Sequence, residues 1–216
     1  MQTTIQPAEG GRKTNMKEKQ IWFLLIVFIA GIISVGSYYV FFKREMRGSG
    51  LPIYDAVPYF KLTERSGKTV SLSDLKGQVW VADFIFTNCA ESCPVMSLRM
   101  KGLQEASASE GIRLVSFSVD PNRDTPEVLA SYANKYGADK NRWLFLTGKE
   151  DFIHALAIKG FHLGVDKEGK QTPILHSDKF VLVDRKGRIR GYFESSSEEG
   201  KKDLLRAIRS LQKEAV

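Results

Sequence analysis

The stretch Val79–Pro94, VWVADFIFTNCAESCP, indicates the fold of this chain. Its first half, Val79–Phe86, is almost continuously apolar and rich in β-forming residues, which is typical of a strand covered on both faces. A helix is expected from about Pro94, because Met96 and Met100 begin an apolar stripe at helical spacing that suits core packing. We therefore predict a buried strand that leads directly into a helix.

The rest of the chain alternates in the same way. The expected strands are Ile112–Val119, Trp143–Leu146, and a hairpin of Phe180–Asp184 with Ile189–Phe193. An earlier hairpin is expected over Phe60–Leu72, with its turn at Ser66 and Gly67. A short turn should then start at Ser73 or Asp74. Three further helices are expected. The first begins at Thr125 and Pro126, the second runs over Asp151–Lys159 and stops at Gly160, and the third covers Lys201–Lys213. This alternation predicts the α/β class, with helices on both faces of a central sheet.

Both cysteines of the chain, Cys89 and Cys93, lie just after the predicted strand Val79–Phe86. In α/β sheets, binding and catalytic groups gather just beyond the carboxyl ends of the strands. The cysteines are therefore expected at the functional edge of the sheet.

An uncharged apolar run, Ile21–Phe42, precedes this domain. A helix of that length, at about 1.5 Å per residue, matches a hydrocarbon core of roughly 30 Å. Aromatic residues and then Lys43 and Arg44 follow the run in place of a signal-peptide cleavage site, so an uncleaved anchor is predicted. We expect a tail over residues 1–20, a transmembrane anchor over 21–42, a linker over 43–54 and one domain over 55–214.

Charge helps to place the chain in the cell. The net charge is +7, but a large part of it flanks the apolar run, and no basic stripe interleaved with aromatic residues follows, so nucleic-acid binding is not expected. Glu9, Glu18 and the lack of serine before the run do not fit a mitochondrial transit peptide. We predict a single-pass protein of the bacterial cytoplasmic membrane, with the amino terminus inside and the domain on the extracytoplasmic side.

Three roles are open to Cys89 and Cys93. A structural disulfide is disfavoured, because closing so short a loop stabilises a protein by only about 2 kcal/mol. Reactive thiolates are favoured, since the amino end of a helix near Cys93 is expected to lower a thiol pKa. Disulfide exchange commonly uses C-x-x-C, whereas the wider C-x-x-x-C spacing leaves room for a metal between two soft sulfur ligands that suit Cu(I).

An imidazole would complete a site with three ligands that could also hold Cu(II). His154 and His162 fall in and after a predicted helix and are expected to be surface or packing residues. His176 stands just before the strand Phe180–Asp184, where a loop can fold back over the cysteines. Structural zinc is disfavoured because it normally takes four protein ligands.

Four segments together resemble the Sco/SenC family of thioredoxin-fold copper proteins. They are FTNCAESCP (Phe86–Pro94), VSFSVDPNRDTPEVLASYA (Val115–Ala133), RWLFLTG (Arg142–Gly148) and ILHSDKFVLVDRKGRIRGYF (Ile174–Phe193), and the match spans about residues 55 to 212. Ala90 departs from the proline that most members have after the first cysteine.

The resemblance implies a thioredoxin-like fold, a mixed central sheet with flanking helices, after one amino-terminal transmembrane helix. It implies copper ligands at Cys89, Cys93 and His176, with copper as Cu(I) or Cu(II). It further implies maturation of the CuA centre of cytochrome c oxidase subunit II, or of another copper enzyme, by copper delivery, by reduction of the target's cysteines, or by both. An upstream copper chaperone and a thiol reductant would be the other partners.

Two further interpretations remain at this stage. The redox-active pair Cys89 and Cys93 would be catalytic in a thiol-disulfide reductase, and one of them alone would act in a thiol peroxidase on the same fold. Asp83 interrupts the apolar strand and is either a hydrogen-bonded structural acid or a neighbour of the site that handles protons. Asp124, with Asp120 and Thr125, is expected to shape a loop and cap a helix.

Overall fold

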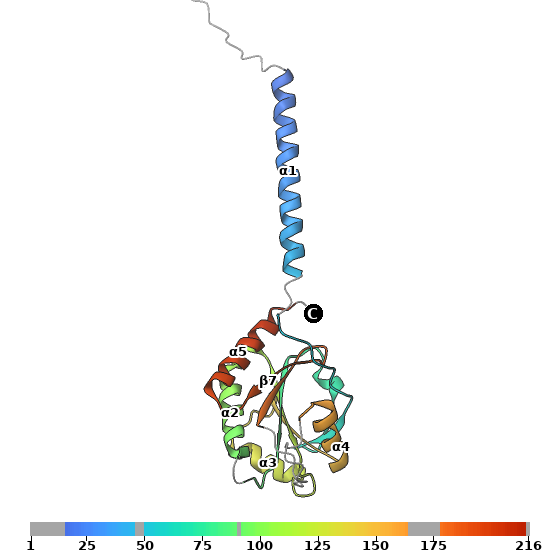
Figure 1. Ribbon diagram of the computed structural model, residues 1–216, viewed down its shortest axis with the longest axis vertical. Helices are drawn as coiled ribbons and strands as arrows, with labels where there is room; N and C mark the ends of the chain where they lie inside the picture. Colours follow the sequence, from blue (N-terminus) through green and yellow to red (C-terminus); the bar gives the residue numbers. More distant parts are fainter. Residues whose placement is uncertain (1–15, 46–49, 90–91, 164–177, 215–216) are drawn as a thin grey trace, which may run out of the picture. The chain divides into compact units, whose positions relative to one another are not determined.

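The computed structural model describes residues 16–45, 50–89, 92–163 and 178–214 (Figure 1). The chain divides into two compact units, Met1–Arg47 and Gly48–Val216. The first contains the helix α1 (Met16–Glu45), which includes the predicted apolar run. Its segment Gln20–Tyr38 has a mean hydropathy of 2.3 and is long and apolar enough to cross a membrane.

The second unit alternates strands and helices along the chain. Its strands are β1 (Lys61–Glu64), β2 (Thr69–Ser71), β3 (Trp80–Ile85), β4 (Arg113–Ser118), β5 (Trp143–Thr147), β6 (Lys179–Val183) and β7 (Ile189–Glu194). Its α-helices are α2 (Ser92–Ala106), α3 (Pro126–Lys135), α4 (Glu150–Ala155) and α5 (Glu198–Gln212). Every strand and helix expected in this unit is therefore present, with shifted ends.

A seven-stranded sheet in the order β2-β1-β5-β4-β3-β6-β7 forms the centre of this unit. The strands β3, β4 and β5 are parallel, because α2 and α3 cross over between them. β1 and β6 join the parallel strands antiparallel, and β2 and β7 complete the two hairpins. The sheet is therefore mixed, as predicted.

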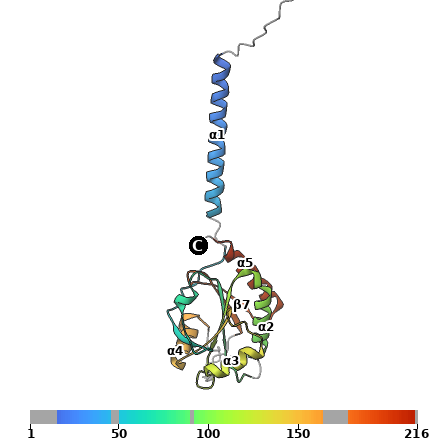
Figure 2. The same cartoon turned by 180° about the vertical axis from the view of Figure 1, so that it is seen from behind.

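Helices cover both faces of the sheet. Figures 1 and 2 show α2 and α5 together on one face and α4 on the opposite face. β3 lies between the two layers, and all six of its residues are buried. This double coverage explains why the sequence of β3 is apolar without alternation.

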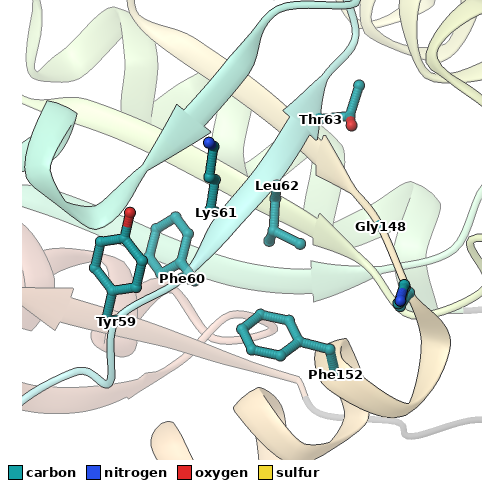
Figure 3. A pocket seen from close by; sticks show the side chains of 8 residues that line it. Tyr59, Phe60, Lys61, Leu62, Thr63, Gly148 and Phe152 are labelled. Atoms are coloured by element: carbon teal, nitrogen blue, oxygen red, sulfur yellow. The ribbon is translucent and has the colours of Figure 1, made fainter.

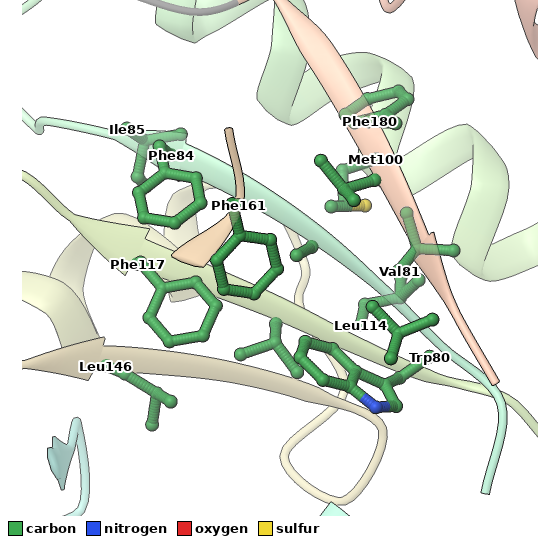
Figure 4. Close-up of a cluster of buried hydrophobic side chains, with 14 of the residues drawn as sticks. Trp80, Val81, Phe84, Ile85, Met100, Leu114, Phe117, Leu146, Phe161 and Phe180 are labelled. Carbon is green, nitrogen blue, oxygen red and sulfur yellow. The ribbon is translucent and has the colours of Figure 1, made fainter. Parts of the chain in front are cut away.

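The core on the α4 side is aromatic (Figure 4). Phe84 of β3 stacks on Phe117 of β4 with ring centroids 5.0 Å apart, and Phe161 packs edge-on against Phe84 at 5.2 Å. On the α2 side, Met96 and Met100 are buried, which confirms that they pack in the core. The sulfur atoms of these methionines are thus structural.

Three element ends differ from the prediction. The turn expected at Ser73 or Asp74 is a 3₁₀ helix over Leu72–Leu75, and the Ser71 backbone N–H before it donates to Asp74 at 2.8 Å. The helix expected after Gly148 is α-helical only over α4, and the chain then continues as a π-helical turn over Leu156–Gly160. α5 starts earlier than expected, since the Ser197 hydroxyl accepts a bond from the Gly200 N–H and caps it.

Candidate functional site

Cys89 and Cys93 lie where β3 passes into α2. Both are free cysteines; Cys89 is half-buried and Cys93 is buried. The Cys93 backbone N–H donates to the Cys89 Sγ atom at 3.4 Å, so Cys89 takes the place of a cap for the first turn of α2. The two sulfur-bearing residues are therefore held together at the carboxyl edge of the sheet, as predicted.

Asp124 holds the loop that carries Cys89. This fully buried carboxylate accepts bonds from the Thr87 hydroxyl and, at 3.1 Å, from the Thr87 backbone N–H. It also accepts a bond from the Ser118 hydroxyl at 2.6 Å. Asp124 thus ties the loop after β3 to the loop after β4, in agreement with its expected role. Thr125 caps α3 by accepting a bond from the Val128 N–H.

The first turn of α2 is also braced from α3. The Tyr132 hydroxyl lies 2.8 Å from the Ser97 hydroxyl and 3.4 Å from the Cys93 carbonyl oxygen, to which it donates. The sequence analysis missed this contribution of Tyr132 and Ser97. Their helical spacing predicts only a packing face, because a pattern of apolar positions says nothing about where a hydroxyl group points.

Burial has the largest effect on the pKa of the Cys93 thiol. It raises the pKa of the Cys93 thiol to about 12, and the nearby Cys89 and Asp83 side chains add to the rise. The expectation that the helix end would lower this pKa is therefore wrong for Cys93, since desolvation outweighs the helix dipole there. Free Cys93 is a neutral thiol at neutral pH and must lose its proton when it forms a bond to a metal or to another sulfur.

Asp83 lies inside the sheet close to this thiol. The residue is fully buried on β3, and burial raises the pKa of its carboxyl group to about 7. A hydrogen-bonding interaction with Ser116, its partner in β4, lowers this pKa to a lesser degree, although neither Asp83 oxygen makes a hydrogen bond of standard geometry to a described group. The two interpretations of Asp83, a hydrogen-bonded structural acid and a neighbour of the site that handles protons, both stay predictions. A carboxyl group that titrates near neutral pH beside a buried thiol suits proton handling.

The structure describes two of the three histidines of the chain, His154 and His162. His154 Nε2 lies 2.9 Å from the Val119 carbonyl oxygen, and His162 Nε2 lies 3.2 Å from Asp55 Oδ2, so both have the packing and surface contacts that were predicted. His176 lies outside the described residues, as does Ala90. Within the described ranges, no group of three His, Cys, Asp or Glu side chains could hold a metal ion. The described part of the site thus contributes two sulfur donors.

These two donors allow two kinds of chemistry. Two neighbouring thiols, one just before α2 and one in its first turn, can bind a soft metal ion such as Cu(I) as thiolates. The same pair can form and break a disulfide bond, in which case the half-exposed Cys89 is the accessible partner for another protein.

Comparison with known proteins agrees with this fold. Residues 52–213 match the model of the SCO1/SenC family. The chain is 36% identical over 162 residues to the SCO1 protein homolog of Bacillus subtilis (strain 168), covering 74% of this chain and 84% of that protein.

Solved structures give the same relationship. The structure of BsSco, described as a Sco-family cytochrome c oxidase assembly protein with a disulfide switch, has a TM-score of 0.66 and 38% identity, covering 74% of this chain and 95% of that one. Bradyrhizobium japonicum ScoI, solved with copper bound, has a TM-score of 0.51 and 27% identity, covering 70% of this chain and 99% of that one. With a thioredoxin-like mixed sheet and its cysteine pair at the edge of that sheet, this chain belongs to the SCO1/SenC family.

Proposed function

We propose that this protein is a membrane-anchored copper metallochaperone that binds one copper ion through Cys89, Cys93 and His176. The observation that carries the proposal is the placement of two free cysteines side by side at the start of α2, with the Cys93 N–H hydrogen-bonded to the Cys89 sulfur. Two adjacent thiolates prefer Cu(I), and a histidine nitrogen would complete a trigonal site. The copper-bound structure of Bradyrhizobium japonicum ScoI supports copper as the cargo.

Loading requires both cysteines to be reduced. Cys89 is the more accessible sulfur and would meet the incoming ion first, after which Cys93 would lose its proton and add the second bond. Asp83 is the ionisable neighbour that could accept this proton, because its pKa of about 7 leaves it partly ionised near neutral pH. Copper affinity should therefore fall as the pH falls.

The proposed recipient rests on the family relationship. We infer delivery to the CuA centre of cytochrome c oxidase subunit II, which fits the description of BsSco as an oxidase assembly protein. An upstream copper chaperone and a thiol reductant would load and reduce the site. The apolar segment of α1 would anchor the domain on the extracytoplasmic side of the cytoplasmic membrane, with the amino terminus inside.

A second candidate function is thiol-disulfide reduction of the oxidase's cysteines, favoured by the disulfide switch described for BsSco. The Cys89 thiolate would attack a target disulfide, form a mixed disulfide and release one target thiolate. Cys93, once deprotonated, would then attack the Cys89 sulfur, form the Cys89–Cys93 disulfide and release the second target thiolate. An external dithiol reductant would restore the two thiols.

Anaerobic titration with Cu(I) tests these functions on the fully reduced chain in detergent. One equivalent should bind tightly to the wild type, and Cys89→Ser, Cys93→Ser or His176→Ala should each weaken binding by at least about tenfold, the effect of losing roughly 1.4 kcal/mol. His154→Ala is the matched control and should bind as the wild type does. If His176→Ala binds copper normally, His176 is not a ligand. If copper binds weakly but the chain readily reduces a model disulfide, reduction is the main function.

A further inference from the structure

A groove lies next to the carboxyl end of β5, outside the cysteine site. Its volume is about 440 Å³, and it is lined by Tyr59, Phe60, Lys61, Leu62, Thr63, Gly148, Lys149 and Phe152. Figure 3 shows the ring of Phe152 pointing from α4 toward Leu62 and Phe60. The groove thus joins the start of β1 to the β5–α4 connection.

The groove has an apolar floor and an exposed aromatic rim. Phe60 and Leu62 of the floor are buried, whereas Tyr59 and Phe152 at the rim are 64% and 40% exposed. Gly148 keeps the space open, because a Cβ atom at this position would come within 2.5 Å of the Leu62 Cδ2 atom. Exposed aromatic side chains around an apolar hollow are typical of recognition sites.

β1 extends past the end of its neighbour at this groove. The pairing of β1 with β5 covers only Thr63 with Thr147 and Glu64 with Leu146, and the chain leaves the sheet at Gly148. β1 therefore has an open edge on the β5 side at Lys61 and Leu62, before its first residue paired with β5.

The backbone hydrogen bonds of β1 alternate between its two neighbouring strands, and this alternation shows which N–H and C=O groups lie on the open edge. The Arg65 N–H donates across to the Phe145 carbonyl oxygen of β5, whereas the Phe60 carbonyl oxygen accepts from the Leu72 N–H on the β2 side. Odd-numbered residues of β1 thus direct their backbone groups toward β5. No described backbone group outside the strands bonds to Lys61 on this side, so its N–H and C=O face the groove.

The charge of the groove and its position in the domain indicate what kind of partner it binds. Both charged groups that line the groove, Lys61 and Lys149, are cations. The groove lies at the sheet edge that carries the cysteines, because α4 contacts the loop after β4: the His154 ring bonds to the Val119 carbonyl oxygen and the Asn122 amide donates to Glu150.

We propose that this groove binds an extended segment of a partner polypeptide that continues the line of β5. The segment pairs its backbone with Lys61, inserts one large apolar side chain between Leu62 and Phe152, and places acidic residues near Lys61 and Lys149. Such addition of a strand to an open sheet edge takes affinity from main-chain bonds and specificity from alternate side chains. The proposal concerns a docking surface and holds whether or not the cysteines carry copper.

The test uses the full chain in detergent and the peptide acetyl-Val-Glu-(4-fluoro-Phe)-Glu-Val-amide, with binding followed by the ¹⁹F signal of the peptide. Because side chains alternate along a strand, its Glu residues lie on the face of Lys61 and its fluoro-Phe on the face of Leu62. Phe152→Ser should weaken binding by about tenfold, since truncating an anchoring aromatic contact costs more than roughly 1 kcal/mol. Val128→Ser, which alters a side chain of the same exposure (39%) on α3, should leave binding unchanged. Empty detergent micelles give the baseline.

Two changes to the peptide test the charge and the strand pairing separately. A peptide with Lys in place of both Glu should bind the wild type more weakly and should bind a Lys61→Glu/Lys149→Glu variant more tightly. N-methylation of the fluoro-Phe amide and N-methylation of an adjacent amide should differ in effect, because the N–H groups of an extended chain alternate between facing β1 and facing the β4 side.

Three outcomes would overturn the proposal. One is equal loss of binding in Phe152→Ser and Val128→Ser, and another is equal tolerance of N-methylation at both positions. The third is saturable binding of the small aromatic anion 1-anilinonaphthalene-8-sulfonate, abolished by Phe152→Ser, together with no peptide binding, which would make the groove a small-molecule site.

Discussion

At the residue scale, the site is governed by the cost of burying ionisable groups. The thiol of Cys93 and the carboxyl group of Asp83 both have a raised pKa, and desolvation is the largest cause in each case. Each negative charge also disfavours the other, so the pair is neutral below about pH 7. A metal cation would reverse this preference, because it favours the deprotonated thiol.

Asp83 makes the stability of the fold depend on pH. Its folded pKa of about 7 lies above the ordinary value of 3.8, so its contribution is fully present below pH 3.8 and is lost as the pH rises through about 7. The loss amounts to about 4 kcal/mol at about 1.36 kcal/mol per pKa unit. Asp83→Asn should remove this dependence, as measured by denaturant unfolding of the reduced protein from pH 4 to pH 8. Identical pH profiles of the wild type and Asp83→Asn would contradict the account, and the exposed change Asp203→Asn should follow the wild type.

The two thiols should differ in their reaction with iodoacetamide. Cys93→Ser retains the half-exposed Cys89, whereas Cys89→Ser retains a buried thiol that is protonated near neutral pH. Because the thiolate is the nucleophile, Cys89→Ser should react more than about tenfold more slowly at pH 7.5. Mass spectrometry of quenched samples gives both rates. Equal rates would show that Cys93 is accessible and ionised, and the same comparison in denaturant should remove the difference.

At the element scale, the cysteine loop depends on contacts made by neighbouring elements. β3 delivers Cys89 to the sheet edge, but the loops after β3 and β4 are joined through Asp124, and α3 supports α2 through Tyr132. The loop geometry is therefore a property of three adjacent elements, as is common where strands β3 and β4 run parallel and end together.

Removal of Asp124 should weaken this junction. Asp124→Ala leaves the Thr87 N–H and the buried Ser118 hydroxyl without their acceptor, at a cost of about 3 kcal/mol for unsatisfied groups. Chemical denaturation should show the reduced free energy of unfolding. The matched change Asp120→Ala removes a carboxylate whose described ion pair, to Arg123, is 3.8 Å long, and it should cost less than about 1 kcal/mol. Similar losses in both variants would refute the special role of Asp124.

At the scale of the whole domain, one buried arginine connects its beginning, its last hairpin and its end. Arg190 of β7 donates to the carbonyl oxygens of Leu51 and Pro52, each at 3.0 Å, and to the carboxylates of Asp184 and Glu214. Its side chain is only 3% exposed, so these acceptors satisfy a charge that would otherwise be buried alone. The cluster closes the domain where the chain enters and leaves it.

Arg190→Met should therefore destabilise the domain. The change leaves Asp184 buried with one cationic partner fewer, and breaking a buried ion pair costs about 3–5 kcal/mol. Thermal and denaturant unfolding should report the loss. Arg206→Met is the control, because Arg206 also pairs with two carboxylates but its side chain is 67% exposed, and little change is expected there. A loss for Arg190→Met no larger than that of the control would show that the cluster does not close the domain.

The sequence by itself determined the class of fold, the order of the elements and the edge of the sheet that carries the cysteines. It could do so because these features follow from local periodicity: continuous apolar runs such as Val79–Phe86, helix starts such as Thr125–Pro126, and turns such as Ser66–Gly67. It also placed Met96 and Met100 in the core, since their helical spacing carried the information.

Only the tertiary structure decided the chemistry at that edge. Spacing predicted a lowered thiol pKa at the start of α2, but the burial of Cys93 by neighbouring elements raises it. The burial of Asp83, the support from Tyr132 and the groove beside Gly148 likewise depend on residues far apart in the chain. Burial and hydrogen-bond satisfaction are properties of packed neighbours, and no local pattern records which distant side chain will fill or leave open a given space.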